Sequence, residues 1–293
     1  MVCALLFFIG QHINKQSCFG LKMSFDEEIR FQYLGRNPSL HAPVLSLIAC
    51  SIIFNSIIFY ILPSTITPLK KSYIVSTVHA LASVLAATLF YLFSTINLKQ
   101  VNRIVGGGIL ATHDEKMVYS LCYSCGYFIY DIIIMLLFKS VRNRSALIHH
   151  VIIASSVLAG LYTGIGHSCH FFFLMEELST IPLNLKTLWN STVRLHKFFN
   201  VLFIASFLFS RLIYGTIIFL YIFRAIPIFI QMASRAHDYI SIVIIFIQGI
   251  LCILTRILNV YWTILIVRKT FSMLQVNQRY TPMQQKEHDQ KTQ

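Results

Sequence analysis

The chain has 293 residues, of which 56% are hydrophobic and only 12% are charged, and its mean hydropathy is +0.67. Soluble domains carry about 25% charged residues, so this composition excludes an ordinary soluble fold and predicts a protein that lies partly in lipid. The net charge of +13 comes from Lys and Arg placed mainly between apolar segments, which favours contacts with anionic headgroups and argues against a nucleic-acid partner.

The first 42 residues form a polar and short apolar extension ahead of the first long apolar segment. Met1 to Gly10 is apolar but short, and it lacks a basic n-region and an obvious cleavage site, so it is a poor signal peptide. Met23 is an alternative start of translation.

Six later segments are long and apolar enough to cross a bilayer, which takes about 20 residues of helix. They are Val44–Leu62, Tyr73–Phe93, Val118–Phe138, Ala146–Gly166, Phe198–Phe223 and Ile240–Val267. A further segment, His167–Leu185, contains three consecutive phenylalanines but also Glu176 and Glu177. It is too polar to face lipid and can cross only if other helices enclose it. We count it as a seventh span, with six as the alternative.

With seven spans, the loops on the side of the C-terminus hold thirteen Lys and Arg residues, and the loops on the other side hold nine. The positive-inside rule makes the C-terminal side cytoplasmic. The sequons at Asn143 and Asn190 fall on that side, so neither is expected to carry sugar.

Ionisable residues within membrane spans are costly and normally face a bundle interior or a wet cavity. Eight such residues occur here: His79, Asp131, His149, His150, Glu176, Glu177, Arg211 and Arg256. At about 1.5 Å per helical residue, they lie about 9 to 21 Å from the basic residues of the proposed cytoplasmic side, in one common layer. Three acidic residues can neutralise the two arginines and a protonated histidine. We therefore predict an all-α, multi-pass transmembrane bundle of six or seven helices that encloses a polar cavity. The alternative is a polar network that only fixes helix packing.

Because adjacent residues point about 100° apart on a helix, only one of His149 and His150 is expected to face the cavity squarely.

Cysteine and histidine patterns are weak evidence for a metal. Cys122 and Cys125 form a C-x-x-C inside an apolar helix with no second pair, which is more typical of small buried residues. His79, His149, His150 and Glu177 are possible zinc ligands, and His167-x-x-His170 lies near the opposite surface. No strong spacing motif joins these groups, so we expect no metal.

Short motifs along most of the chain, from Tyr73 to Val267, resemble the TLC-domain family, which includes ceramide synthases and translocon-associated membrane proteins. The motifs are Val75–His79, Gly126–Asp131, His149-His150, Glu177–Ser179 with Asn184, Arg211, and Asn259–Trp262. Within the family the likeness is greatest to TLC domain-containing proteins 4 and 5. Ceramide synthases carry His-Asp-x-x-Asp 25 residues after a His-His pair. Here the 25 residues after His150 lead to Glu176-Glu177-Leu-Ser-Thr180, so the acidic partner is only partly kept, which argues against ceramide synthesis.

The resemblance implies a role in lipid homeostasis, by binding or sensing lipid or acyl chains in the intramembrane cavity. The alternative is a membrane acyltransferase that uses fatty acyl-CoA as co-substrate, with phosphates held by the basic rim of Lys139, Arg142, Arg144, Arg194 and Lys197. That rim also suits topology and headgroup contact. The candidate catalytic residues are His149, His150, Asp131 and Glu177. The candidate ligand-binding residues are His79, Tyr127, Glu176, Ser179, Asn184, Arg211, Arg256, Asn259 and Trp262.

A transporter or channel would show inverted repeats or paired broken helices, and none is evident. The expected organisation is a 1–42 extension, a transmembrane TLC-like domain over 43–270 and a disordered cytoplasmic tail over 271–293. The expected partners are membrane lipids. The family suggests the endoplasmic reticulum or another endomembrane.

Overall fold

A computed structural model describes residues 41–93, 115–189 and 192–291. Within these ranges, helices form over the long apolar segments of the sequence. The N-terminal extension, apart from its last two residues, lies outside the described residues. Six of the described helical segments are long and apolar enough to cross a membrane. The predicted all-α, multi-pass bundle is confirmed.

The first four long helices are α3 (His41–Ile61), α4 (Pro68–Phe93), α6 (Glu115–Leu137) and α7 (Arg144–Thr163). The chain then continues through α8 (His167–Phe173), the 3₁₀ segment η4 (Leu174–Ser179) and α9 (Thr180–Leu188). A continuous helical run follows as α10 (Val193–Phe207), the π-helical segment η5 (Leu208–Tyr214) and α11 (Gly215–Arg235), and α12 spans Tyr239–Lys291.

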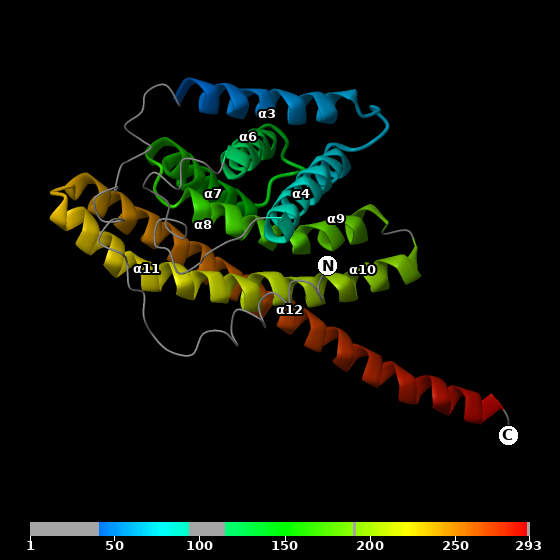
Figure 1. Ribbon diagram of the computed structural model, residues 1–293. Coiled ribbons are helices and arrows are strands. Elements are labelled where there is room, and N and C mark those ends of the chain that lie inside the picture. The colour runs from blue at the N-terminus through cyan, green and yellow to red at the C-terminus, as the bar shows by residue number, and fades with distance from the viewer. Residues whose placement is uncertain (1–40, 94–114, 190–191, 292–293) are drawn as a thin grey trace.

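In Figure 1, α3 lies on one side of the bundle, α10, α11 and α12 lie on the opposite side, and the remaining helices fill the space between them. Helix α3 packs on α6, α6 packs on α7, and α4 packs on η4 and α9. The α3–α4 and α9–α10 turns lie at one end of the bundle and the α11–α12 turn lies at the other, which agrees with the seven-crossing interpretation (Figure 1).

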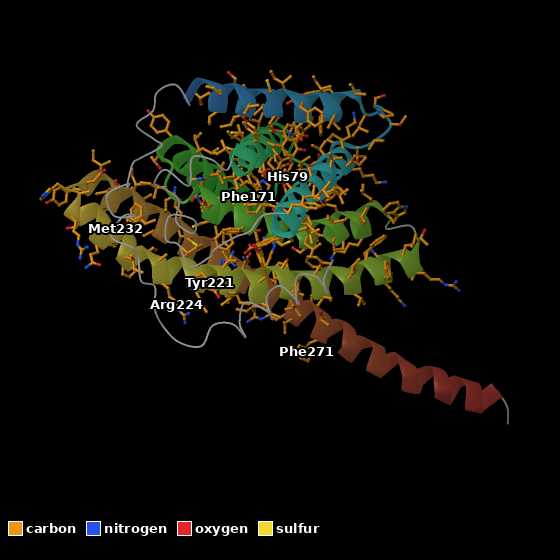
Figure 2. The ribbon with its side chains drawn as sticks, in the orientation of Figure 1. His79, Phe171, Tyr221, Arg224, Met232 and Phe271 are labelled. Atoms are coloured by element: carbon orange, nitrogen blue, oxygen red, sulfur yellow. The ribbon has the colours of Figure 1, made fainter. Side chains whose placement is uncertain are left out.

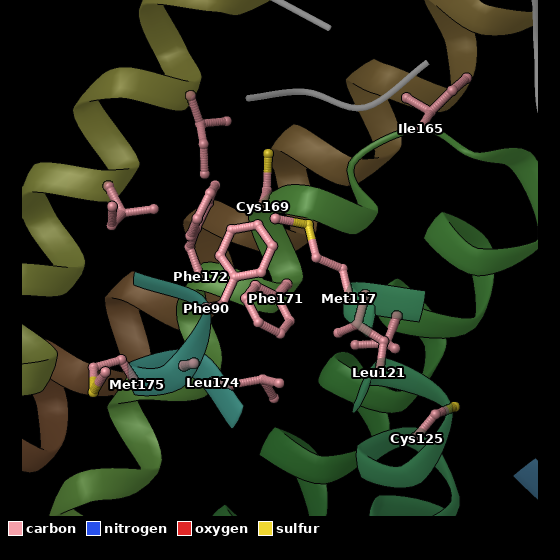
Figure 3. Packing of buried hydrophobic residues seen from close by; sticks show 14 of the residues in the cluster. Phe90, Met117, Leu121, Cys125, Ile165, Cys169, Phe171, Phe172, Leu174 and Met175 are labelled. Atoms are coloured by element: carbon pink, nitrogen blue, oxygen red, sulfur yellow. The ribbon is translucent and has the colours of Figure 1, made fainter. Parts of the chain in front are cut away.

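The α8–η4–α9 segment is enclosed by the long helices, as its polarity predicts. Phe171 and Phe172 are 1% and 2% exposed. Figure 3 shows their rings beside Phe90 of α4 and close to Met117 and Leu121 of α6. Enclosure by protein allows this segment to keep polar groups at membrane depth.

The cysteines of the C-x-x-C motif, Cys122 and Cys125, are buried in the same hydrophobic core and form no disulfide. They pack there as small core residues, as expected.

Several boundaries differ from the prediction. Helix α4 starts at Pro68, five residues earlier than predicted, because proline suits the first helical position and Lys71 Nζ donates to the Leu62 carbonyl across the turn at 2.6 Å. Helix α11 continues through Pro227 to Arg235.

Helix α12 runs on to Lys291, beyond the bundle, through the segment predicted to be a disordered tail (Figure 1). An isolated helix has no packing to stabilise it in water, so the disorder of that tail stays a prediction.

Two glycines make the sharp reversal between α7 and α8. Gly164 (φ 72°) caps the end of α7, and Gly166 (φ 81°) precedes α8. Both conformations are left-handed, a region that favours glycine.

At the other end of α7, the Asn143 side chain accepts hydrogen bonds from the backbone of Ser145 and Ala146, which fixes the helix start.

Candidate functional site

A pocket of about 380 Å³ lies in the middle of the bundle, in the half that contains the α6–α7 and α9–α10 turns. Side chains from α4, α6, α7, η4, α9, α10, η5 and α12 line it. Its lining combines a polar part with aliphatic and aromatic side chains. The polar part includes Ser72, Ser76, Tyr127, Asp131, His149, His150, Glu177, Ser179, Thr180, Asn184 and Arg211.

Asp131 of α6 lies beside His150 of α7 in the pocket. His150 Nδ1 lies 2.9 Å from Asp131 Oδ2, an ion pair when the ring is protonated. The two groups are close but poorly aligned for a hydrogen bond, because Nδ1 has no partner of acceptable geometry among the described residues. The other carboxylate oxygen of Asp131 accepts a hydrogen bond from Ser72 Oγ at 3.4 Å. This is the geometry of a histidine held beside an acid.

Arg211 is the most heavily bonded polar side chain of the pocket. Its Nε donates to Ser179 Oγ at 2.9 Å, and Nη1 donates to Asn259 Oδ1 at 3.3 Å. Nη2 lies 3.9 Å from Glu177 Oε1, a loose ion pair, and donates to Thr180 Oγ1 at 3.5 Å. The guanidinium is therefore tied to η4, α9 and α12 at once.

Glu176 and Arg256 form a second ion pair, through Oε1 of the glutamate and Nη2 of the arginine. Asn259 Nδ2 donates to the other oxygen of Glu176 at 3.1 Å. Since Asn259 also accepts from Arg211, it links the two ion pairs. Gly215 leaves room for this pair, because a Cβ atom there would collide with both side chains.

Departures from α-helical geometry place these charges. Arg211 lies within the π-helical segment η5, and Glu176 and Glu177 lie within the 3₁₀ segment η4. Short 3₁₀ and π segments inside helices are often found at functional sites. Here they turn three charged side chains toward one another.

His149 and His150 both line the pocket. That only one of them faces it squarely stays a prediction. His149 is 5% exposed and meets Trp262 of α12 edge-to-face, with ring centroids 4.9 Å apart.

His79 does not line the pocket. Its ring stacks on Tyr127 at a centroid distance of 3.8 Å, and its Nε2 lies 3.1 Å from Ser83 Oγ. Figure 2 places His79 deep among the helices. It supports a pocket residue, Tyr127, from behind.

The structure therefore brings most of the predicted site residues to one place. Asp131, His149, His150, Glu177, Tyr127, Ser179, Asn184, Arg211 and Trp262 line the pocket. Glu176, Arg256 and Asn259 lie directly behind them, and His79 lies one layer away.

Sequence reasoning missed several polar residues. Ser76 accepts a hydrogen bond from Asn184 Nδ2 at 2.9 Å within the pocket. Gln248 of α12 makes a buried cluster with Ser156 and His170, at 2.6 Å and 3.0 Å from its Oε1. Serine and other uncharged polar residues are common in transmembrane helices, so they do not mark a site by themselves. The one sequence signal for this cluster was a glutamine in the middle of an apolar helix.

The basic rim is largely exposed, and part of it is occupied. The Arg142 side chain donates hydrogen bonds to the backbone carbonyls of Met135 and Leu136 and so caps the end of α6. Lys139, Arg144, Arg194 and Lys197 are exposed at the same end of the bundle. Among the described residues, no group of three or more His, Cys, Asp and Glu side chains is arranged to hold a metal ion.

Comparisons with known proteins agree with the motifs. The TLC-domain family model matches residues 71–268. TLC domain-containing protein 4 C of Dictyostelium discoideum is 27% identical over 223 residues, which cover 71% of this chain and 74% of that protein. No solved structure is significantly similar to the chain.

Proposed function

The chain belongs to the TLC-domain family, and from this membership we propose that its pocket binds a membrane lipid or acyl chain as part of lipid homeostasis. Proteins with this domain are typically membrane proteins of lipid metabolism or homeostasis. The proposal adds a site and a ligand class to that general role.

The observation that carries the proposal is a pocket whose lining combines ionic and apolar side chains. Beside Asp131, His150 and Arg211, the pocket is lined by aliphatic and aromatic side chains. They are Leu69, Met135, Val141, Leu183, Phe203, Phe207, Leu265 and Ile266. Lipids combine a polar group with a long apolar chain, so they match both kinds of lining at once.

The pocket also reaches the outer surface of the bundle. Leu265 of α12 lines it and is nevertheless 42% exposed. This part of α12 lies in a helix long and apolar enough to cross a membrane, so we expect its exposed residues to face hydrocarbon. A lipid can therefore enter from the bilayer beside Leu265.

Mass spectrometry of lipid that stays bound to the purified protein tests this function. We expect a defined lipid to co-purify with the wild type and to be lost from Leu265→Trp, because the larger ring fills the mouth of the pocket. Leu254→Trp is the matched control: Leu254 lies on the same helix and is 40% exposed, but it lines no part of the pocket. The proposal fails if no lipid is retained or if both variants retain it equally.

Acyl transfer is a second candidate function, and the contact between His150 and Asp131 favours it. With fatty acyl-CoA as donor, His150 would take the proton from an amine or hydroxyl acceptor as that acceptor bonds to the acyl carbon. The thioester C–S bond would then break, and the departing thiolate would recover the proton from His150. Glu177 and His149 line the same pocket and are the other candidate catalytic groups.

Turnover of labelled acyl-CoA by the purified protein distinguishes the two functions. Acyl transfer that is abolished in His150→Ala would establish the enzyme. Retained lipid without turnover would establish a binding or sensing protein. For either function, we propose membrane lipids as the partners, the endoplasmic reticulum or another endomembrane as the location, and the cytoplasm as the side that holds the C-terminus.

A further inference from the structure

A second, smaller cavity of about 60 Å³ lies behind the first, and the proposed function makes no use of it. Its lining is mostly apolar, with Phe128, Ile153, Val157, Phe173, Leu174 and Cys252. Its polar residues are largely satisfied within the protein: Ser156 and His170 bond to Gln248, and Glu176 pairs with Arg256.

The two cavities follow one another along α7 and α12. On α7, residues 143–150 line the first and 149–157 line the second. On α12, residues 262–266 line the first and 252–256 line the second. From Asn143 to Val157 this track covers about 21 Å at about 1.5 Å per residue, roughly two-thirds of the hydrocarbon core. The cavities are thus two parts of one elongated track.

Three side chains line both cavities and form the wall between them: His149, Glu177 and Arg211. The charges at this depth already have partners. Arg211 faces Glu177 and Arg256 faces Glu176, while Asp131 lies beside His150 and accepts a hydrogen bond from Ser72. Neither Arg211 nor Arg256, the arginines that line the two cavities, is left over for an anionic group, and burial of an unpaired charge here is unfavourable.

The wall and the deep cavity contain polar atoms without a hydrogen-bond partner, which an uncharged ligand group could supply. His149 is 5% exposed, and its Nδ1 has no partner among the described residues. Nε of Arg256, in the deep cavity, also has none within the part of the chain that the structure describes. Buried polar groups of this kind are normally satisfied, so both point to a ligand oxygen or amide.

We propose that the bound lipid is a single-chain amphiphile. Its uncharged polar group (an ester, thioester, amide or hydroxyl) bonds to His149, and its chain passes the wall into the deep cavity. This inference rests on the proposed function and narrows its ligand class. The charge balance argues against a carboxylate or phosphate at this depth, and a deep cavity of about 60 Å³ leaves room for one chain and not two.

Thermal unfolding of the full chain in detergent, with defined single-chain probes, tests the polar group. A ligand that binds only the folded state raises Tm according to its affinity. Hexadecanol and palmitamide are expected to raise Tm, and palmitate at neutral pH is expected to bind at least about 100-fold more weakly. The response to hexadecanol should be lost in His149→Phe and kept in His149→Gln. Equal binding of palmitate would overturn the assignment of an uncharged group.

Plugging the deep cavity tests the path of the chain. Thr255 lines the deep cavity and not the first, so Thr255→Trp should fill the deep cavity alone. This variant should abolish the rise in Tm with hexadecanol and keep the rise in Tm with the shorter dodecanol. Ile153→Trp is a second plug from α7, in case the first variant unfolds. Leu254→Trp, beside Thr255 on the outer face, should respond like the wild type.

Unchanged chain-length preference in both plugged variants would overturn the deep-cavity assignment. That result would leave lipid co-purification intact, whereas failure of the proposed function would show as no retained lipid at all.

Discussion

At the scale of single residues, the charges of the bundle interior are tolerable because they are paired. Glu176 and Arg256 are close partners, and Asn259 holds the second carboxylate oxygen. Removal of one member of a buried ion pair leaves the other uncompensated, which is far more costly than removal of both.

Arg256→Met is therefore expected to lower the free energy of unfolding by about 3–5 kcal/mol. The double variant Arg256→Met with Glu176→Gln should recover much of that loss, because no unpaired charge remains. Denaturant unfolding in detergent measures both. A double variant less stable than Arg256→Met would show that the pair itself, and not charge compensation, stabilises this region.

Sequence alone was enough to single out these residues, since charge inside an apolar span is conspicuous. The sequence could not predict which side chains these charged residues would contact. Asp131 meets His150, and Arg211 reaches Ser179 and Asn259, because of helix rotations that hydropathy does not encode. His79 shows the same limit: it has the right depth, but it faces Tyr127 and not the pocket.

At the scale of helices, close contact between α3 and α6 depends on one glycine. A Cβ atom on Gly126 would lie 2.7 Å from the Ile48 carbonyl and would collide with the Ser51 side chain. Small residues allow transmembrane helices to approach closely in this way. The carbonyl of Tyr123, one turn earlier on α6, accepts a hydrogen bond from Ser51 Oγ at 2.6 Å across the same contact.

Gly126→Ala should destabilise the protein by about 1–3 kcal/mol, because α3 must move away from α6. Gly249→Ala on α12 is the matched control, since its Cβ would only touch Ile226 at 3.7 Å. The control should be neutral or up to about 1 kcal/mol more stable, as alanine favours the helix. Thermal unfolding of the two variants side by side provides the comparison, and equal effects would refute the close-contact explanation.

The long helices could be predicted from the sequence because apolar length alone specifies them. Their irregular parts could not. The π-helical segment η5 and the 3₁₀ segment η4, which carry Arg211 and Glu177, have no local sequence signature. Helix α11 likewise continues through Pro227, beyond the predicted end at Phe223.

At the scale of the whole molecule, the seven-crossing interpretation predicts that the two ends of the membrane domain lie on opposite sides. The enclosed segment α8–η4–α9 is the seventh crossing, since six apolar helices alone would return the chain to its starting side. Charge counts across the loops then predict that the C-terminal side is cytoplasmic.

The topology predicts that Asn143 stays unglycosylated in cells, because this N-cap residue of α7 lies in the α6–α7 turn, on the side that the charge counts predict to be cytoplasmic. The sequon at Asn190, outside the described residues, should behave in the same way. Ile104→Thr creates a sequon at Asn102 in the opposite loop, which is the positive control. Endoglycosidase treatment should shift only the variant on a gel. Sugar on Asn143 would invert the assigned orientation.

The central claim is that separate helices join their polar side chains in one enclosed pocket that holds lipid. Photo-crosslinking with a clickable, photoactivatable fatty alcohol, followed by peptide mapping, measures this most directly. We predict that the label concentrates on pocket residues such as Leu183, Phe203 and Phe207 and disappears in Leu265→Trp. Label spread evenly over the lipid-facing surfaces of α3 and α12, unchanged in Leu265→Trp, would contradict the account.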